Sequence, residues 1–290
     1  MKAVRWVFIA AYLLVAAVPL VWLFVTSIKY DIDVTAEKVK WIPNPATPKN
    51  APTVTFPPTV GQSWLLLNDK AYAQTEFPLI HYFINSLIVA FVSTLASVAL
   101  GTSCAYGFSR FKIAGDKDWL FFILSTRFLP PLAVVVPILI MYRTLNLTDT
   151  MFGLILLYTV FNLSLAVWLM KGFIDEIPKA YEEAALVDGY SWMQAFWKII
   201  VPQAATGMAV TAVFCLISAW NEFGFALILN NSQKAMTAPV IFKYFLGRTT
   251  GVPWALLAAG ALLYAVPIII FTVIVRKHIL RGMTFGTIKQ

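Results

Sequence analysis

Few residues in this 290-residue chain are of the kinds that carry out covalent or metal chemistry. The two histidines, His81 and His278, lie far apart, and the two cysteines, Cys104 and Cys215, fall inside long apolar runs. Neither pair has the spacing of a metal site or of a disulfide framework. The sequence also has no G-x-x-x-x-G-K-[ST] phosphate loop. We therefore expect no catalytic residue, no metal ligand and no ATP site in this chain.

A different set of polar residues lies within apolar runs, and consists of Arg127, Asn162, Asn221 and Glu222. Polar groups are expensive in lipid, so they usually face a cavity or a partner. Three roles stay open for them: lining or gating a pore, contact with a partner protein, and snorkelling to the membrane surface. Arg127 and Glu222 are expected at different heights across the membrane, unless kinks at the prolines that follow Arg127 bring them together.

The composition predicts an integral membrane protein. Hydrophobic residues make up 60% of the chain and charged residues 12%, against roughly 45–50% and 25% in soluble domains. Apolar runs of about 20 residues or more are long enough to span a bilayer as helices. They predict six spans, at residues 4–28, 79–108, 119–142, 151–170, 205–229 and 254–275. The first run is too long for a secretory signal and has no cleavage site, so we expect it to remain as a span.

Charge bias indicates how the spans are oriented. An even number of spans places both termini on one side, and short loops rich in Lys and Arg mark the cytoplasm. Most basic residues outside the long segment 29–78 fall on one face, which we therefore assign to the cytoplasm together with both termini. The net charge of +8 is explained by this anchoring and gives no indication of nucleic-acid binding.

The segment 29–78 is rich in proline, so it cannot form continuous helix or sheet. We expect an exposed extracytoplasmic loop there, serving either as a solvated connector or as a docking surface for an external partner. On the fifth span, small residues recur every fourth position and predict close helix packing rather than ligand binding, at Gly207, Thr211, Cys215 and Ala219.

Residues 181–202, YEEAALVDGYSWMQAFWKIIVP, form a polar interruption between two apolar spans. Pro178 suits the first position of a short helix of about nine residues, two acids favour its positive end, and Gly189 can take the left-handed conformation that ends it. Ser191 and Gln194 form a capping box that starts a second helix, which Pro202 closes. By spacing alone, the first helix either docks into a partner or lies on the membrane surface.

These residues carry a family resemblance. Glu183-Ala184-Ala185, then Gly189, then Ile199 and Val201-Pro202 resemble the E-A-A-x(3)-G-x(9)-I-x-L-P signature of the permeases of bacterial ABC importers, with valine in place of leucine. NSLIVA at 85–90, AYGFSRF at 105–111, WNEFGFAL at 220–227 and RGMTFGTIKQ at 281–290 are similar to the carbohydrate branch, specifically to the maltose-type second permease. The likeness covers most of residues 80–290.

The resemblance implies an all-α membrane protein of the inner membrane that performs no covalent chemistry itself. Its partners would be a second homologous permease, a dimer of ATPase subunits that holds ATP and Mg, an extracytoplasmic solute-binding protein and the lipid bilayer. The implied ATPase-coupling residues are Glu182, Glu183, Ala184, Ala185, Asp188 and Gly189. The implied tail contacts with the ATPase are Arg281, Gly282 and Thr284, and the alternative for this polar tail is a frayed cytoplasmic end.

The expected organisation has four parts: a first span at 1–28, the Pro-rich loop at 29–78, a permease core at 79–276 with a coupling loop at 172–204, and a cytoplasmic tail at 277–290. Alternating access would move a carbohydrate inward. A self-sufficient secondary transporter is the alternative, but it would more often show inverted repeats with matched broken helices. A membrane-embedded enzyme would need a converging catalytic set.

Overall fold

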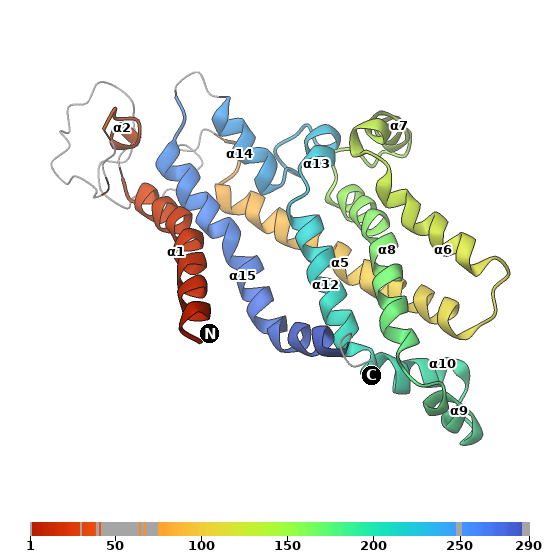
Figure 1. Cartoon of the computed structure of the whole chain (residues 1–290). Helices are drawn as coiled ribbons and strands as arrows, with labels where there is room; N and C mark the ends of the chain where they lie inside the picture. The colour runs from red at the N-terminus through yellow and green to blue at the C-terminus, as the bar shows by residue number, and fades with distance from the viewer. Residues whose placement is uncertain are drawn as a thin grey trace. The chain divides into compact units, whose positions relative to one another are not determined.

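The computed structural model describes residues 2–29, 31–38, 41, 64, 67, 75–247 and 251–285, with only the backbone at 2–4, 31, 32, 132 and 277–285. These residues form helices and no strand (Figure 1). In chain order the helices are α1 (Lys2–Ser27), α2 (Asp31–Val34), α5 (Leu79–Arg110), α6 (Asp116–Ser125), η2 (Thr126–Phe128), α7 (Pro131–Thr144), α8 (Met151–Asp175), α9 (Ala180–Val187), α10 (Trp192–Ala195), η3 (Phe196–Ile200), α11 (Val201–Gln203), α12 (Ala205–Trp220), α13 (Gly224–Leu229), α14 (Ala238–Leu246) and α15 (Trp254–Phe285). The chain divides into two compact units: Met1–Ile84 with Thr237–Ile268, and Asn85–Met236 with Ile269–Gln290.

Four helices in the described part of the chain are long and apolar enough to cross a membrane singly, and they lie in α1, α5, α8 and α15. Two further pairs of helices meet this test only when each pair is counted as one bent span. Among the described residues this test gives four spans, or up to six if each bent pair is one span, so the exact count of six stays a prediction. The all-helical membrane architecture predicted from the composition is confirmed.

The first unit contains α1 and an aromatic cluster. No part of the most apolar window of α1 is buried, which suits a helix surrounded by lipid or by another protein. Elsewhere in this unit the ring of Phe83 lies 5.8 Å from that of Phe242 and 6.2 Å from that of Tyr264. Gly260 permits this packing, because a Cβ there would lie 2.8 Å from the Phe242 ring. Of segment 29–78 little is described, although the Trp64 indole donates to Ser27 Oγ at 3.1 Å.

The second unit is built on α5, α8 and α12, which pack closely. A Cβ at Gly101 of α5 would lie 2.5 Å from Ala166 Cβ of α8, and a Cβ at Gly207 of α12 would lie 2.4 Å from the Phe173 ring of α8. All four small residues of the predicted stripe on α12 are buried. The interpretation of this stripe as a packing surface is confirmed, and the glycines allow helix axes to approach as small residues do in membrane bundles.

Two spans that the apolar runs predicted as continuous are broken. The run at 119–142 divides into α6 with η2 and then α7, with a bend of 95° between the two parts. Pro130 and Pro131 explain this break, because proline removes a backbone donor and disfavours helix at the residue before it. The run at 205–229 ends its first helix at Trp220 and resumes at Gly224. Its continuity was therefore wrongly predicted, since hydropathy alone does not register a break in backbone hydrogen bonding.

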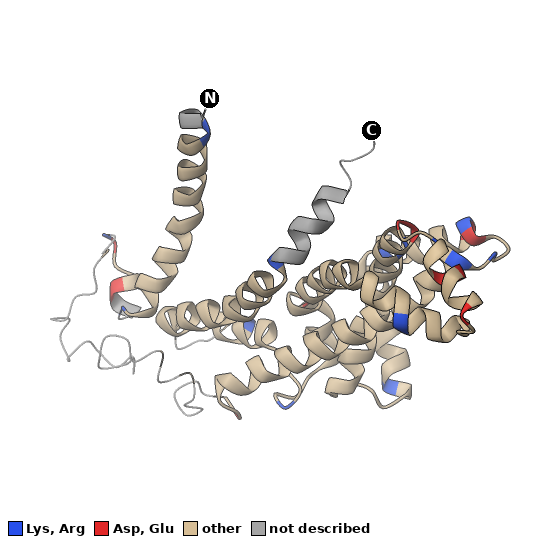
Figure 2. Ribbon diagram, turned by 90° about the horizontal axis from the view of Figure 1, so that it is seen from below, with Lys and Arg blue, Asp and Glu red and all other residues tan. Residues whose placement is uncertain are grey.

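Charged residues of the second unit gather around α9 and α10, whereas its long helices carry few of them (Figure 2). Among the basic residues near α9 and α10, Arg110 contacts α9 through Glu182 and Lys198 lies in η3. Asp149 links the loop between α7 and α8 to the loop between α13 and α14. Its carboxylate accepts hydrogen bonds from the backbone N–H groups of Asn231 and Ser232 at 2.6 and 2.8 Å.

Candidate functional site

The short helix α9 and the turn after it have the form that the sequence predicted. Glu182 and Glu183 lie in its first turn, where carboxylates suit the positive end of a helix. Gly189 has a φ of 87°, the left-handed conformation expected there, and the N–H of Tyr190 returns to the carbonyl of Ala185. The helix is eight residues long and begins at Ala180, two residues later than expected.

The second helix of this loop begins at the predicted position, but it does not end at the predicted Pro202. Ser191 and Gln194 form both hydrogen bonds of the capping box. Beyond α10, however, the chain continues through the π-helical η3 and through α11, so Pro202 does not close the helix. Pro202 stands in the first turn of α11, where a missing N–H is tolerated. The direction of the chain changes by 73° only at the junction with α12.

The two adjacent acids of α9 face opposite environments. Glu183 is exposed together with Ala184, Asp188 and Gly189, while Glu182 and Ala185 are buried. The Glu182 carboxylate accepts two hydrogen bonds from Arg110 Nε, at 2.8 and 3.0 Å, and both side chains are only 2–3% exposed. Glu182 therefore fastens α9 to the end of α5, and the outer surface of α9 presents Glu183.

The outer surface of the α9–α10 loop also carries apolar residues. Tyr181 is 54% exposed, Val187 88%, Met193 65% and Trp197 59%. Beneath them, a buried cluster joins α5, α8 and η3, and contains Ala105, Tyr106, Met170, Ile174, Phe196, Ile200 and Ala204. The loop thus has a packed inner side and an outer side that combines acids with exposed apolar groups, which is typical of a protein-binding surface.

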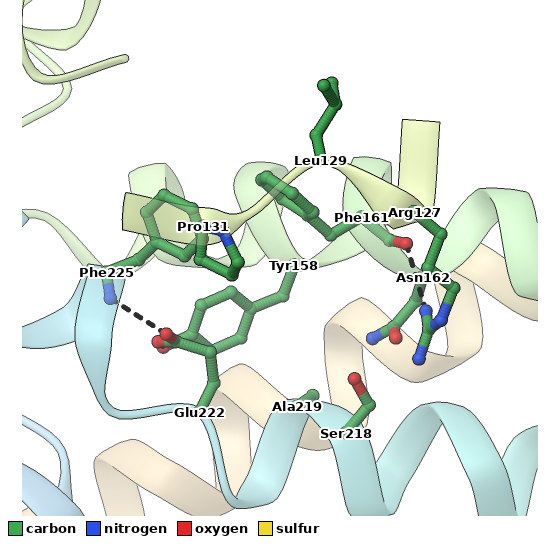
Figure 3. Close-up of a pocket in the computed structure, with 10 residues that line it drawn as sticks. All are labelled: Arg127, Leu129, Pro131, Tyr158, Phe161, Asn162, Ser218, Ala219, Glu222 and Phe225. Carbon is green, nitrogen blue, oxygen red and sulfur yellow. Dashed lines mark hydrogen bonds between the residues drawn. The ribbon is translucent and has the colours of Figure 1, made fainter. Parts of the chain in front are cut away.

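A pocket lies within the second unit, between η2, α8 and the α12–α13 junction (Figure 3). Its lining is aromatic and polar and comprises Arg127, Leu129, Pro131, Tyr158, Phe161, Asn162, Ser218, Ala219, Glu222 and Phe225. Three of the four predicted polar residues meet there: Arg127, Asn162 and Glu222. The break after η2 turns the chain here, so Arg127 and Glu222 share one pocket although their helices suggested different heights.

Glu222 is held by several hydrogen bonds. Its carboxylate accepts from Tyr158 Oη at 2.5 Å and from the backbone N–H groups of Phe225 and Ala226 at 2.8 and 3.1 Å. These N–H groups belong to the first turn of α13, so Glu222 caps that helix as an anion at its positive end. Its negative charge is therefore largely compensated within the pocket.

The other polar residues differ in how they are engaged. The Arg127 side chain is exposed and donates to the Phe161 carbonyl at 3.4 Å, at the far side of the pocket from Glu222 (Figure 3). Asn162 donates to the Cys215 carbonyl at 3.3 Å, and its buried Oδ1 has no partner among the described residues. Asn221 does not line the pocket but donates to Ile217 of its own helix.

Sequence reasoning did not identify the partners of the Glu182 and Glu222 carboxylates. Arg110 appeared there only within the AYGFSRF stretch, and Tyr158 lies in an apolar run where nothing distinguishes its hydroxyl. The only available signal was the requirement that a buried carboxylate be paired. At the tail, α15 continues as helix to Phe285, while the side chains of Arg281, Gly282 and Thr284 lie outside the described residues.

The chain is similar to several transport permeases. The trehalose transport system permease protein SugB of Mycobacterium tuberculosis is 37% identical over 71% of this chain and 76% of its own length. A putative ABC transporter permease protein, ORF1, of Streptomyces antibioticus is 34% identical over 75% of this chain and 95% of its own. A bacterial ABC transporter that imports the acidic polysaccharide alginate has a chain with a TM-score of 0.74 at 22% identity, covering 95% of both chains.

The family match covers the part of the chain that contains the α9 loop and the pocket. Residues 97–284 match the family described as "Binding-protein-dependent transport system inner membrane component". This match excludes the alternative, a self-sufficient secondary transporter. The chain therefore belongs to the family of inner-membrane components of binding-protein-dependent transport systems.

Proposed function

We propose that this chain is the permease subunit of an ATP-binding-cassette importer that carries a carbohydrate into the cytoplasm. Membership of the binding-protein-dependent family, together with the α9 turn that its signature requires, carries the proposal. The carbohydrate class is supported by relatives whose names refer to trehalose, to trehalose and maltose, and to diacetylchitobiose. The chain would form the pore, and a separate ATPase dimer would bind ATP and Mg.

The outer surface of α9 is the proposed contact with the ATPase. The helix is short and is followed by Gly189 in the left-handed conformation, and its outer surface exposes Glu183 beside Tyr181 and Val187. A surface that combines acids with exposed apolar groups fits a protein cleft better than it fits an anionic lipid surface. Movement of the ATPases would reach the pore through this helix, with the tail at 277–290 as an additional contact.

The pocket in the second unit is the proposed path of the carbohydrate. Aromatic rings offer faces for a sugar ring, and Arg127 offers donors that no carboxylate among the described residues occupies. Glu222, by contrast, supports α13. We assign the contact with substrate hydroxyls to Arg127 and Asn162, and a supporting role to Glu222. An extracytoplasmic solute-binding protein would deliver the sugar, and a second homologous permease would complete the pore.

Co-purification tests the proposed assembly. The tagged chain, extracted from bacterial membranes in mild detergent, should retain a second permease and an ATPase in stoichiometric amounts. Glu183→Lys should lose the ATPase but keep the second permease, whereas Glu176→Lys, the same charge change at an exposed position before α9, should keep both. A chain that purifies alone and transports alone would contradict the proposal.

A further inference from the structure

The end of α5 contacts several segments of the α9–α10 loop, although Arg110 and Glu182 are 72 residues apart in sequence. Arg110 Nε holds the carboxylate of Glu182 in α9, and Arg110 Nη2 donates to the carbonyl of Ile177 at 2.9 Å, in the link between α8 and α9. One side chain at the last position of α5 thus binds both α9 and the chain that leads into it.

Two aromatic contacts extend this attachment. The Tyr106 ring lies 4.8 Å from that of Phe196 in η3, and the Phe111 ring lies 5.4 Å from that of Trp192 in α10. The α9–α10 loop is therefore attached at α9, α10 and η3 to α5 and to Phe111, the residue that follows it, and it is also joined to α8 and α12, the helices that it connects.

The ion pair is well placed to hold α9 rigidly. Both side chains are nearly inaccessible to water, so separating them in place would leave each charge poorly solvated. Removing one partner of a buried pair leaves an uncompensated charge, which makes separation far more unfavourable than at an exposed pair. The guanidinium also has fixed donor directions, and so it restrains the orientation of the carboxylate as well as its distance.

Above the pair, α5 is itself closely packed on α8. Ser97 Oγ donates to the carbonyl of Thr159 at 3.1 Å, and Gly101 leaves no room for a side chain against Ala166. Thr159 lies one position after Tyr158, which lines the pocket. A displacement of α9 that moves α5 therefore acts on the same stretch of α8 that lines the pocket.

We infer that Arg110 is a positioning residue for coupling: through Glu182 and Ile177 it makes α9 and the end of α5 move as one body, so that force applied to α9 reaches the pore helices. This inference rests on the proposed function, because it requires an ATPase that moves α9. In this inference Glu182 acts inside the protein, through its ion pair with Arg110, and the exposed Glu183 makes the contact with the ATPase.

The test measures a distance in the assembled complex. Spin labels are placed at Ala180, the exposed first residue of α9, and at Ser103, an exposed position on α5, after both native cysteines have been replaced by alanine. The probe is Mg·ATP with vanadate, so no sugar has to be known. In the otherwise native complex the distance distribution should keep a single, unshifted peak when the probe is added.

Breaking the pair should release this restraint. Arg110→Gln and Glu182→Gln should each broaden the distribution and shift its peak on addition of Mg·ATP and vanadate, and the double variant should do no more than either single one. The matched control is Lys171→Gln, which removes an exposed ion pair with Asp175 on α8 and should leave the distribution unchanged. Complexes are compared at equal amounts, so lower abundance alone does not mimic the result.

Two results would overturn the inference: a peak that shifts in the native complex, or unchanged peaks in both glutamine variants. If Arg110→Gln does not accumulate, Arg110→Lys keeps the charge but loses the fork that reaches both Glu182 and Ile177. It should then give an intermediate distribution, and a native one would equally overturn the inference. Failure of the proposed function is recognised separately, because no ATPase would then purify with the native chain.

Discussion

Replacing Gly189 should uncouple the transporter without preventing membrane insertion. The residue has a φ of 87°, and a Cβ built on it meets no atom within 4 Å. A side chain at position 189 would therefore destabilise the turn through the strained backbone conformation and not through clashes with neighbouring atoms. A left-handed backbone costs an ordinary L-residue roughly 1–2 kcal/mol, and a β-branched residue more. A free-energy change of about 1.4 kcal/mol changes an equilibrium constant tenfold. Gly189→Ala should therefore lower by about tenfold the ratio of chains with the native left-handed turn after α9 to chains without it.

The assay is ATP hydrolysis by the purified complex with its solute-binding protein, normalised to the amount of complex. The expected order of stimulated activity is native, then Gly189→Asn, then Gly189→Ala, then Gly189→Val, because asparagine tolerates the left-handed region. Gly172→Ala is the matched control, since this glycine also has open space around it but lies within helix α8. Native stimulation in Gly189→Val would refute the reasoning.

Three other substitutions or deletions follow from the same structure. Arg127→Ala should reduce uptake more than assembly, as measured by transport per purified complex, and unchanged uptake would leave Arg127 as a packing or snorkelling residue. Gly207→Leu should lower stability by about 1–3 kcal/mol, because a Cβ there would already overlap the Phe173 ring, and a native melting temperature would contradict this. Deleting 282–290 should lower coupled ATP hydrolysis or complex stability but not insertion, and native values for both would support a frayed tail.

The positions of the single-helix spans could be predicted because hydropathy over about 20 residues reflects the solvent directly. The apolar runs that became α5, α8 and α15 gave helices at the expected places, each longer than its run. The turn at Gly189 and the capping box at Ser191 were also predictable, since each depends on residues that are adjacent in sequence.

The breaks were harder to predict, because an apolar run does not reveal where backbone hydrogen bonds are interrupted. Pro130 and Pro131 suggested kinks, yet the resulting bend turned the run into separate helices. Helix α14 went unpredicted because it lies in a short, mixed segment that is below the length of a span.

The pairings of buried charges could not be predicted at all from one sequence. Nothing in the spacing of Arg110 and Glu182 indicates that they meet, and Tyr158 is one of many aromatic residues in the apolar runs. Such contacts depend on how helices pack, and hydrophobic periodicity limits that packing only loosely. The sequence therefore located the short helix α9 and its two adjacent acids, while the structure separated the buried Glu182 from the exposed Glu183.

Uptake into proteoliposomes tests the central claim most directly. Vesicles that contain this chain, its second permease and the ATPase, with Mg·ATP inside and the solute-binding protein outside, are supplied with labelled trehalose, maltose and diacetylchitobiose. We predict that at least one of these sugars accumulates, that accumulation stops when ATP, the ATPase or the binding protein is omitted, and that this chain alone accumulates none. Sugar uptake by this chain alone, without ATP, would contradict the account.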